Sequence, residues 1–480
     1  MPNRHRLLSS KDRHELLQGA LGERHFDYPD AHVVDIRPLV RFSCWSLLST
    51  ENQRPSSTAY PNRSTKLRRV IQLARPTSSR FSTIRDFTLG DLVPAKPQDL
   101  GRARTLFITP ESHRHNLESH FIDRSFSPIG RRLDHTSVLL SVQALSMVAR
   151  RQRLRQTFIQ RATVSTKQLS EILTESFREH VTQRQMLEQL KADFARFESG
   201  RLVGRQLLRN LPDLEHLVTS SWYQPHVMGV IHEFNAAGLT TVDIQHGQQG
   251  PYQSMFVGLP RTHQLNESVT PAEFWVWGSK TRQLMTDNRD EYSGIHVTGY
   301  PFLLDTSIYR ERLSRDFPNL SSDVLVSLHA PHLDSPEEVP FDIVRDLCDS
   351  GLSVQLRQHP NHKLSPSSRD KVRMEFSDSV RISDAVLPFA VVVPSVRLNV
   401  SGFSSTTLEA ASLGVPSLLW SEVAEAQYAD LMDSGVVCAS RNFRSASEHI
   451  EASANIDFSA VEKYIAPGEE QLMARITNLS

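Results

Sequence analysis

Cysteine is scarce in this sequence, and its few copies are far apart. The 480 residues contain three cysteines, Cys44, Cys348 and Cys438, and no two of them have the Cys-x-x-Cys spacing. An odd number of widely spaced cysteines supports neither a disulfide framework nor a zinc knuckle. We therefore expect a protein of a reducing compartment, and the cytoplasm is the simplest choice.

Long apolar runs and a surplus of one charge are also missing. No run of about 18 apolar residues is present, so we expect no membrane-spanning helix. Residues 1–19 are polar and lack the apolar centre of a signal peptide. Lys+Arg and Asp+Glu both total 54, so the net charge is zero and we expect no nucleic-acid partner.

One local surplus of positive charge stands out in the first part of the chain. Residues 51–104 hold eleven Lys/Arg against four Asp/Glu and are rich in serine and proline. We interpret the stretch as a long solvated loop. The open alternative is a basic surface that supports peripheral association with the inner membrane or contacts a polyanionic acceptor.

The fingerprints of several common enzyme classes are absent. The sequence has no Gly-x-Gly-x-x-Gly after a strand, no Gly-x-x-x-x-Gly-Lys-[Ser/Thr] and no Gly-x-Ser-x-Gly. His329-Ala-Pro-His332 and His359-Pro-Asn-His362 each contain a proline, so neither is the helical pair that binds zinc in metalloproteases. We expect no metal and no cofactor.

The sequence does contain short apolar runs that alternate with helical segments. Thr105–Pro110 is a buried-strand candidate, and helical patterning dominates from His135 to about Asn210. Strands and helices then alternate from Leu214 to the 296–301 region, and a second alternating set begins at Val324. Alternation of this kind predicts parallel sheets covered by helices on both faces.

The length and this alternation predict an α/β protein with two Rossmann-like, doubly wound domains facing a cleft. We place the domains at residues 105–305 and 310–465, followed by a C-terminal helix at 466–480. Residues 1–104 form a poorly defined N-terminal part, in which His32–Ile36 is a strand candidate. In the second domain, Ala390–Val393 is also strand-like.

A hydroxyl-rich loop lies between a predicted strand and a predicted helix in the second domain. Ser404, Ser405 and Thr406 precede the helical segment 406–413, and Thr406 and Glu409 have the spacing of a capping box. The three hydroxyls exceed what one cap needs. We therefore predict a phosphate site here, made of hydroxyl donors and the free N–H groups at the helix start.

Histidines follow two other predicted strands of the second domain. His359 follows the strand Leu352–Leu356 after Arg357 and Gln358, and Pro360 biases its backbone to an extended conformation. His329 ends the first strand of the domain. Imidazole and guanidinium groups donate hydrogen bonds to phosphate, so His329, Arg357 and His359 are candidate donor-site residues.

The first domain offers one comparable motif. The strand at 241–244 ends in Gln245-His246-Gly247, followed by Gly250. Ligands of open α/β sheets bind beyond the carboxyl ends of the strands, which places His246 on the side of the second domain. We expect the two glycines to allow a sharp turn close to a substrate.

These motifs, in this order over residues 210 to 440, resemble those of bacterial GT-B glycosyltransferases of surface-polysaccharide assembly. The His359-Pro360 pair with Ser404-Ser405 is similar to the nucleotide-phosphate site of sialyl- and Kdo-type transferases that use CMP-sugars. The same order, with His246-Gly247 first, also resembles the CDP-glycerol polyol-phosphate transferases. The Glu-x7-Glu motif of retaining enzymes is absent, because Ser401 stands eight residues before Glu409.

The resemblance implies a metal-independent glycosyltransferase. It implies catalytic roles for His246 and His359, and substrate contacts from Gln245, Gly247, His329, Arg357, Ser404, Ser405, Thr406 and Glu409. The expected partners are a nucleotide-sugar donor and a polysaccharide or glycolipid acceptor. Two alternatives stay open: a polyol-phosphate transferase that uses a CDP-alcohol, and a non-catalytic scaffold subunit of polysaccharide assembly.

Overall fold

The structure is a computed structural model of the chain. It describes residues 10–21, 37–51, 88–89, 93–94, 102–110, 113–116, 121–135, 137–142, 167–257, 268–286, 294–314, 322–329, 338–439, 450 and 456–479, apart from isolated positions within these ranges. The predicted strand at His32–Ile36 and most of the basic stretch lie outside the described residues.

The first sheet has eight strands in the order β10-β9-β8-β7-β3-β6-β1-β2. Its strands are β1 (Thr88–Leu89), β2 (Val93–Pro94), β3 (Thr105–Thr109), β6 (Ser137–Ser141), β7 (His216–Thr219), β8 (Thr240–Ile244), β9 (Glu273–Val276) and β10 (Ile295–Val297). The run from β10 to β6 is parallel, whereas β1 and β2 are antiparallel additions at one edge. The strand order reverses between β3 and β7, which makes their ends the switch point of this sheet.

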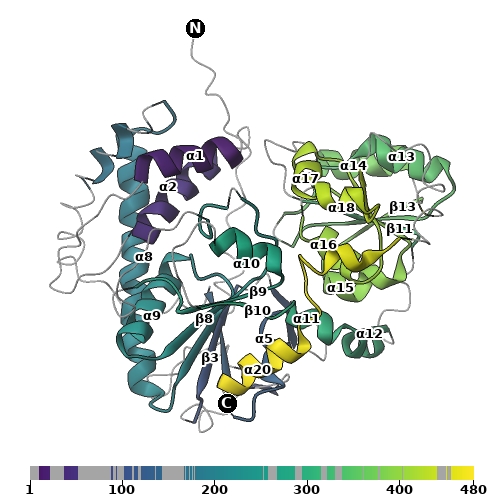
Figure 1. Ribbon diagram of the computed structural model, residues 1–480. Coiled ribbons are helices and arrows are strands. Elements are labelled where there is room, and N and C mark those ends of the chain that lie inside the picture. Colours follow the sequence, from purple (N-terminus) through teal and green to yellow (C-terminus); the bar gives the residue numbers. More distant parts are fainter. Residues whose placement is uncertain are drawn as a thin grey trace, which may run out of the picture.

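Helices cover both faces of the first sheet (Figure 1). A separate two-stranded antiparallel sheet is formed by β4 and β5. These elements are α1 (Ser10–Leu21), α2 (Arg37–Glu51), β4 (Arg114–Asn116), β5 (Phe121–Asp123), α5 (Phe126–Gly130), α8 (Gln183–Asn210), α9 (Pro225–Ala236), α10 (Ser279–Thr286) and α20 (Glu469–Leu479). Successive β3 residues alternate between the faces: Leu106 and Ile108 join the cluster with α2, α8 and α9, and Phe107 joins the cluster with α5 and α20.

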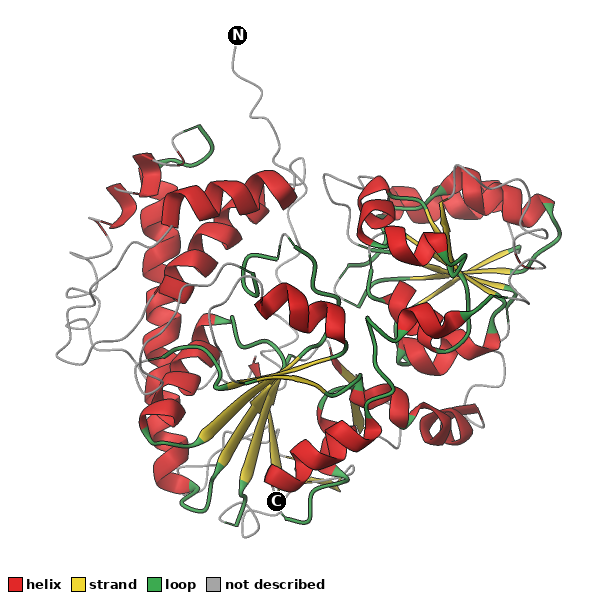
Figure 2. Cartoon of the chain, viewed as in Figure 1, coloured by secondary structure: helices red, strands yellow, loops and turns green. Residues whose placement is uncertain are grey.

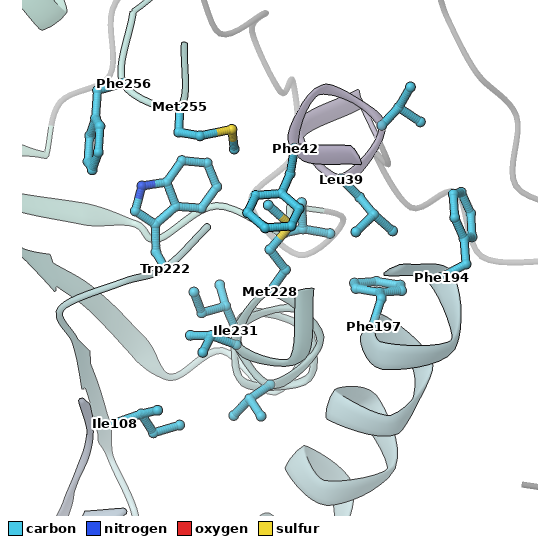
Figure 3. Packing of buried hydrophobic residues seen from close by; sticks show 14 of the residues in the cluster. Leu39, Phe42, Ile108, Phe194, Phe197, Trp222, Met228, Ile231, Met255 and Phe256 are labelled. Atoms are coloured by element: carbon cyan, nitrogen blue, oxygen red, sulfur yellow. The ribbon is translucent and has the colours of Figure 1, made fainter. Parts of the chain in front are cut away.

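The core on the α8 side takes in the early helix α2, which the sequence did not predict. Leu39 and Phe42 of α2 are buried beside Met228 of α9 and Phe197 of α8 (Figure 3). Arg41, on the same helix, donates to the carbonyl oxygen of Val257 at 2.9 Å. Helix α2 is therefore integral to the first core.

Helices α8 and α9 approach each other closely through glycine. A Cβ atom at Gly200 would lie 2.0 Å from the His226 carbonyl oxygen, and one at Gly229 would lie 2.1 Å from the Phe197 carbonyl oxygen. At the start of α8, Thr182 and Gln185 form a capping box. Gly238, with φ +77°, follows α9 as the sequence predicts.

The second sheet has six strands, all parallel, in the order β13-β12-β11-β14-β15-β16. The strands are β11 (Val324–Ser327), β12 (Val354–Arg357), β13 (Val380–Ser383), β14 (Leu398–Ser401), β15 (Ser417–Leu419) and β16 (Val437–Ala439). In chain order this is 3-2-1-4-5-6, the usual doubly wound arrangement of Rossmann domains, with its switch point between β11 and β14.

The second sheet is also sandwiched between helices (Figure 2). They are α13 (Phe341–Asp349), α14 (Pro366–Phe376), α15 (Phe389–Val392), the 3-10 turn η3 (Val393–Ser395), α16 (Thr406–Ser412), α17 (Glu422–Gln427) and α18 (Ala429–Asp433). The prediction of an α/β protein with two Rossmann-like, doubly wound domains in a GT-B arrangement is confirmed.

The chain passes between the two domains twice. It leaves the first domain through α11 (Pro301–Leu304) and α12 (Thr306–Ser314), and it returns after η6 (Phe458–Val461) to α20. The two connecting segments are in contact near Thr298 and Gly468, because a Cβ atom at Gly468 would lie 2.4 Å from the Thr298 carbonyl oxygen. Gly299 and Gly468 have φ values of +71° and +38°, which side chains rarely adopt.

Several local predictions are wrong. The predicted helical range from His135 contains β6, because a short apolar run does not distinguish a buried strand from a helix. Residues 51–104 are not loop throughout, since β1 and β2 lie within them.

The valines at 390–393 form α15 and η3 rather than a strand. Pro388 directly precedes α15, and Pro394 lies within η3. Proline has no N–H group to contribute to the hydrogen bonds of a sheet. Ala390, Val391 and Val392 are instead buried against neighbouring helices.

The capping box predicted at Thr406 and Glu409 is not formed. Helix α16 starts at Thr406 with Ser405 as its N-cap residue, and the Ser405 side chain forms no capping hydrogen bond. No helix among the described residues combines the length and the apolar character that crossing a membrane requires.

Candidate functional site

The strand ends at the switch point of the first sheet bring two histidines together. His113 follows β3 and His246 follows β8, and their ring centroids are 5.2 Å apart. The Nδ1 atom of His113 lies 3.2 Å from the Ser220 hydroxyl, which follows β7. The sequence analysis missed His113, because no strand-end motif marks it.

One nitrogen of His246 is buried and the other lies beside a tyrosine. The Nδ1 atom is buried and has no hydrogen-bond partner among the described residues. The Nε2 atom lies 3.3 Å from the hydroxyl of Tyr223, which packs against Phe42 of α2. Of the two ring nitrogens, only Nε2 has a hydrogen-bonding neighbour among the described residues.

Burial and, to a smaller extent, the charge of Arg124 lower the pKa of His246 to about 4. Burial also raises the pKa of Tyr223 to about 12, so this hydroxyl stays protonated at neutral pH. His246 is therefore neutral at pH 7 and able to accept a proton at Nε2.

The residues on either side of His246 shape its loop. The Gln245 amide donates to the Gly247 carbonyl oxygen at 2.9 Å and accepts from the Trp277 backbone N–H at 2.7 Å. Gln245 is 3% exposed, so its side chain holds the loop from within. The backbone bends at Gly247, but neither Gly247 nor Gly250 has the positive φ that favours glycine.

Arg124, which the sequence analysis also missed, follows the hairpin strand β5. The Asp123 carboxylate beside it accepts from the Thr109 hydroxyl at 2.6 Å and from the backbone N–H of Phe126 at 2.9 Å, which fixes the turn. Arg124 interacts electrostatically with His246 of the first domain and with His359 of the second.

The second domain contributes Arg357 and His359 at the end of β12. Burial and the neighbouring positive groups, including Arg124 and Arg357, lower the pKa of His359 to about 4. Burial and the charge of Arg124 lower the pKa of Arg357 to about 10, so this buried guanidinium remains charged at neutral pH. Its Nη2 donates to the Leu387 carbonyl oxygen at 2.6 Å.

His329 lies at the end of β11, on one side of the switch point. Its ring stacks on Trp420, with centroids 5.4 Å apart and planes inclined by 22°. A Cβ atom at Gly402, just after β14, would lie 2.1 Å from the His329 Nε2. Gly402 therefore makes room for this histidine, and the three residues form one packed unit.

The predicted hydroxyl loop lies on the other side of this switch point. Ser404, Ser405 and Thr406 are half-buried, and the Ser404 hydroxyl accepts from the Thr406 backbone N–H at 3.3 Å. Glu409 is 1% exposed, and its Oε2 has no hydrogen-bond partner among the described residues. Burial raises the pKa of Glu409, and Arg124 and Arg357 only partly oppose that rise.

A tyrosine connects the loops of the two domains. The Tyr428 hydroxyl lies 3.0 Å from the Ser404 carbonyl oxygen and also bonds the side chain of Gln248, two residues after His246. A Cβ atom at Gly250 would be 3.7 Å from the Gln427 side chain. The His246 loop is therefore in contact with the second domain.

A second contact between the domains lies at α10 and α18. Lys280 donates to the Asp430 carboxylate at 3.0 Å and to the Tyr464 hydroxyl at 2.6 Å, and Lys463 reaches Asp430 at 2.7 Å. Burial alone would raise the pKa of Asp430, but these hydrogen bonds lower it to about 2. The described residues contain no cluster of three or more metal-ligating side chains.

Comparison with known proteins adds likenesses of fold. No protein-family model matches the chain, and no curated protein matches its sequence. The structure of UDP-GlcNAc 2-epimerase from Methanocaldococcus jannaschii, in complex with UDP-GlcNAc and UDP, is 10% identical at a TM-score of 0.46 and covers 78% of this chain and 100% of its own. The Neisseria meningitidis enzyme, bound to UDP-GlcNAc, is 14% identical at a TM-score of 0.46 and covers 79% and 100%.

A variant of the wall teichoic acid polymerase TagF is 11% identical at a TM-score of 0.39, and the match covers 57% of this chain and 74% of that one. At such TM-scores and identities, these likenesses say nothing about which reaction the present chain performs. The fold assignment rests on the strand orders, and the site rests on the chain's own residues.

Proposed function

We propose that the chain is a glycosyltransferase of the GT-B type that moves a sugar from a nucleotide-activated donor, a CMP-sugar in the favoured form, to a surface polysaccharide or glycolipid acceptor. The proposal rests on one observation: residues at strand ends of both sheets lie in the same region of the molecule. His246 follows a strand of one sheet and His359 follows a strand of the other, yet both interact with the Arg124 guanidinium.

The second domain would hold the donor. Arg357, His359 and the hydroxyls of Ser404, Ser405 and Thr406 are the groups that we assign to its phosphate. His329 completes the donor side of the site at the switch point. Glu409 is too deeply buried to act as an exposed base, and we assign it the task of holding the neighbouring guanidiniums in place.

In the proposed reaction, the acceptor hydroxyl attacks the anomeric carbon of the donor sugar. The bond between that carbon and the phosphate oxygen breaks, and its electron pair leaves with the nucleotide. His246 Nε2 takes the proton of the acceptor hydroxyl. The positive groups around His359 stabilise the charge that develops on the departing phosphate. Gln245 and Gly247 would shape the acceptor side through the loop that they form.

A second candidate is polyol-phosphate transfer from a CDP-alcohol. In that reaction the acceptor hydroxyl attacks the outer phosphorus, the phosphate–phosphate link breaks and CMP leaves. The presence of two guanidiniums, Arg124 and Arg357, in the same site favours this candidate, since a diphosphate carries a charge for each. Analysis of the product separates the two: the acceptor gains a sugar alone in the first case and a phosphate in the second.

The test is donor turnover by folded His246→Ala and His359→Ala proteins, together with a panel of nucleotides in a thermal-shift assay. A ligand that binds only the folded state raises the unfolding temperature. We expect both substitutions to lower turnover at least ~100-fold, the range typical of acid–base catalysis. Near-normal turnover in both variants would refute the assignment, and no response to any nucleotide would favour the scaffold alternative.

A further inference from the structure

Arg124 is held in a fixed position at the boundary between the domains. Its backbone N–H donates to the His113 carbonyl oxygen at 3.2 Å. The buried carboxylate of Asp123 pins the turn that follows, as described above, through Thr109 and two backbone N–H groups. The arginine side chain therefore extends from a rigid support toward the second domain.

The guanidinium of Arg124 lacks the partner that a buried arginine usually has. Arg132, a few residues later, contacts both carboxylate oxygens of Asp305, at 3.0 and 2.9 Å. Arg124, by contrast, forms no direct ion pair with any described residue, and its Nε is buried without a hydrogen-bond partner. Its neighbours are the Tyr300 hydroxyl and the more distant charges of Asp123 and Glu409.

Arg357 is in the same situation on the other side. It is 7% exposed, its printed partner is a backbone carbonyl, and no described carboxylate pairs with it directly. Burial and the charge of Arg124 both lower the pKa of Arg357, and Glu409 is an acidic neighbour of both guanidiniums. Burial opposes the charge of Arg124, but Tyr300, Glu409 and Asp123 outweigh burial and raise its pKa. Like charges that lack direct partners are costly to bury.

An anion placed between the two guanidiniums would turn this repulsion into two attractions. Arginine's planar fork binds phosphate through paired hydrogen bonds, and burial strengthens such bonds. We infer that Arg124 is a phosphate-binding residue contributed by the first domain, and that the donor phosphate is held between Arg124 and Arg357. The inference rests on the proposed function and adds to it that the donor bridges the two domains.

The probe that tests this inference is inorganic pyrophosphate, because it presents phosphate groups without a base or a sugar. We expect pyrophosphate and CMP to raise the unfolding temperature of the native protein, and cytidine, which has no phosphate, to have little effect. In Arg124→Gln, the dissociation constants of pyrophosphate and CMP should both rise at least ~10-fold, which corresponds to one lost charge-assisted hydrogen bond. The dissociation constants of Arg124→Lys should lie between those of the native protein and those of Arg124→Gln, since lysine keeps the charge but lacks the planar guanidinium.

Two control variants separate binding from structure. Arg397→Gln removes the same charge from an exposed position of the second domain and should leave the response to pyrophosphate unchanged. Tyr300→Phe removes a protein neighbour of Arg124 and leaves the guanidinium, so it should keep most of the response. A loss of folding alone would lower the unfolding temperature of Arg124→Gln without changing how much pyrophosphate raises it.

The outcomes also separate this inference from the proposed function. An equal response to pyrophosphate in native protein and Arg124→Gln would overturn the role of Arg124, even if donor turnover is found. No response of the native protein to pyrophosphate would overturn it as well. A response to pyrophosphate that needs Arg124, without a response to any nucleotide, would support the phosphate site and count against the transferase.

Discussion

The imidazole rings of His113 and His246 lie 5.2 Å apart between centroids, although more than a hundred residues separate them in the chain. The contact exists because β3 and β8 end at the same edge of a parallel sheet, on either side of β7. His113 is 5% exposed, so we assign it the support of the His246 ring rather than contact with a substrate.

We therefore expect His113→Gln to misplace His246. Turnover should fall roughly 10- to 100-fold, because small displacements of a catalytic group are costly, while the donor affinity stays nearly unchanged. Steady-state kinetics, together with thermal shifts by CMP, would measure the two effects. Ser220→Ala, which removes the hydroxyl 3.2 Å from the His113 Nδ1, should have a smaller effect of the same kind. A loss of donor affinity with normal turnover would contradict this role.

The pH dependence of the reaction should reveal the depressed pKa of His246. A base must be deprotonated to act, so a pKa of about 4 preserves activity down to about pH 4, whereas an ordinary histidine would lose it near pH 6.5. The profile of kcat/KM reports the free enzyme and should show this low midpoint. The profile of kcat should have a higher midpoint, because the bound phosphate offsets the charge of Arg124. Midpoints near 6.5 in both profiles would rule out a buried, depressed histidine as the base.

Gly402 is expected to tolerate no side chain. The added Cβ of Gly402→Ala would meet the His329 Nε2 at 2.1 Å and Trp420 at 2.7 Å, so the stacked pair must move. Overpacking of this kind costs about 1–3 kcal/mol. Urea unfolding would measure the loss, and a weaker thermal shift by CMP would show that His329 has left the donor site. Gly19→Ala is the control, because a Cβ there meets nothing within 4 Å and alanine favours the helix.

Asp430→Asn should loosen the contact between the domains. The carboxylate takes hydrogen bonds from Lys280 of α10, Lys463 and Tyr464, and their loss should cost on the order of 1–3 kcal/mol at pH 7. Because the folded-state pKa lies below the unfolded value, this stabilisation is present above about pH 4 and is lost as the pH falls toward 2. The free energy of unfolding, measured at several pH values, would follow this loss of stabilisation. Asp433→Asn, an exposed change on the same helix, should have little effect, and equal losses in both variants would argue against the contact.

Most of the second sheet was predictable, because most of its strands are short apolar runs followed by a helix or a breaker, but β16 was not predicted. Periodicity fails where tertiary packing decides, as in the valines of α15, which lie between prolines and bury themselves as a helical turn. It also fails for α2, whose burial depends on α8 and α9.

The candidate site was predictable only where a strand leads straight into a polar motif. His246, His359 and the hydroxyl loop meet this condition, and their roles stay predictions until the variants are measured. Arg124 follows a three-residue strand with no apolar periodicity, and its importance comes from a residue far along the chain, Arg357. Charge complementarity between distant segments leaves no local pattern in a sequence.

The return of α20 to the first domain has a consequence for biosynthesis. Leu472 and Ile476 cover the face of the first sheet that Phe107 and Trp275 line, so that face stays open until residues 469–479 have left the ribosome. The second domain is in this sense an insertion within the first, and it is complete before the first can finish folding. Although domains usually fold in the order of their synthesis, the earlier one here must wait for the later one.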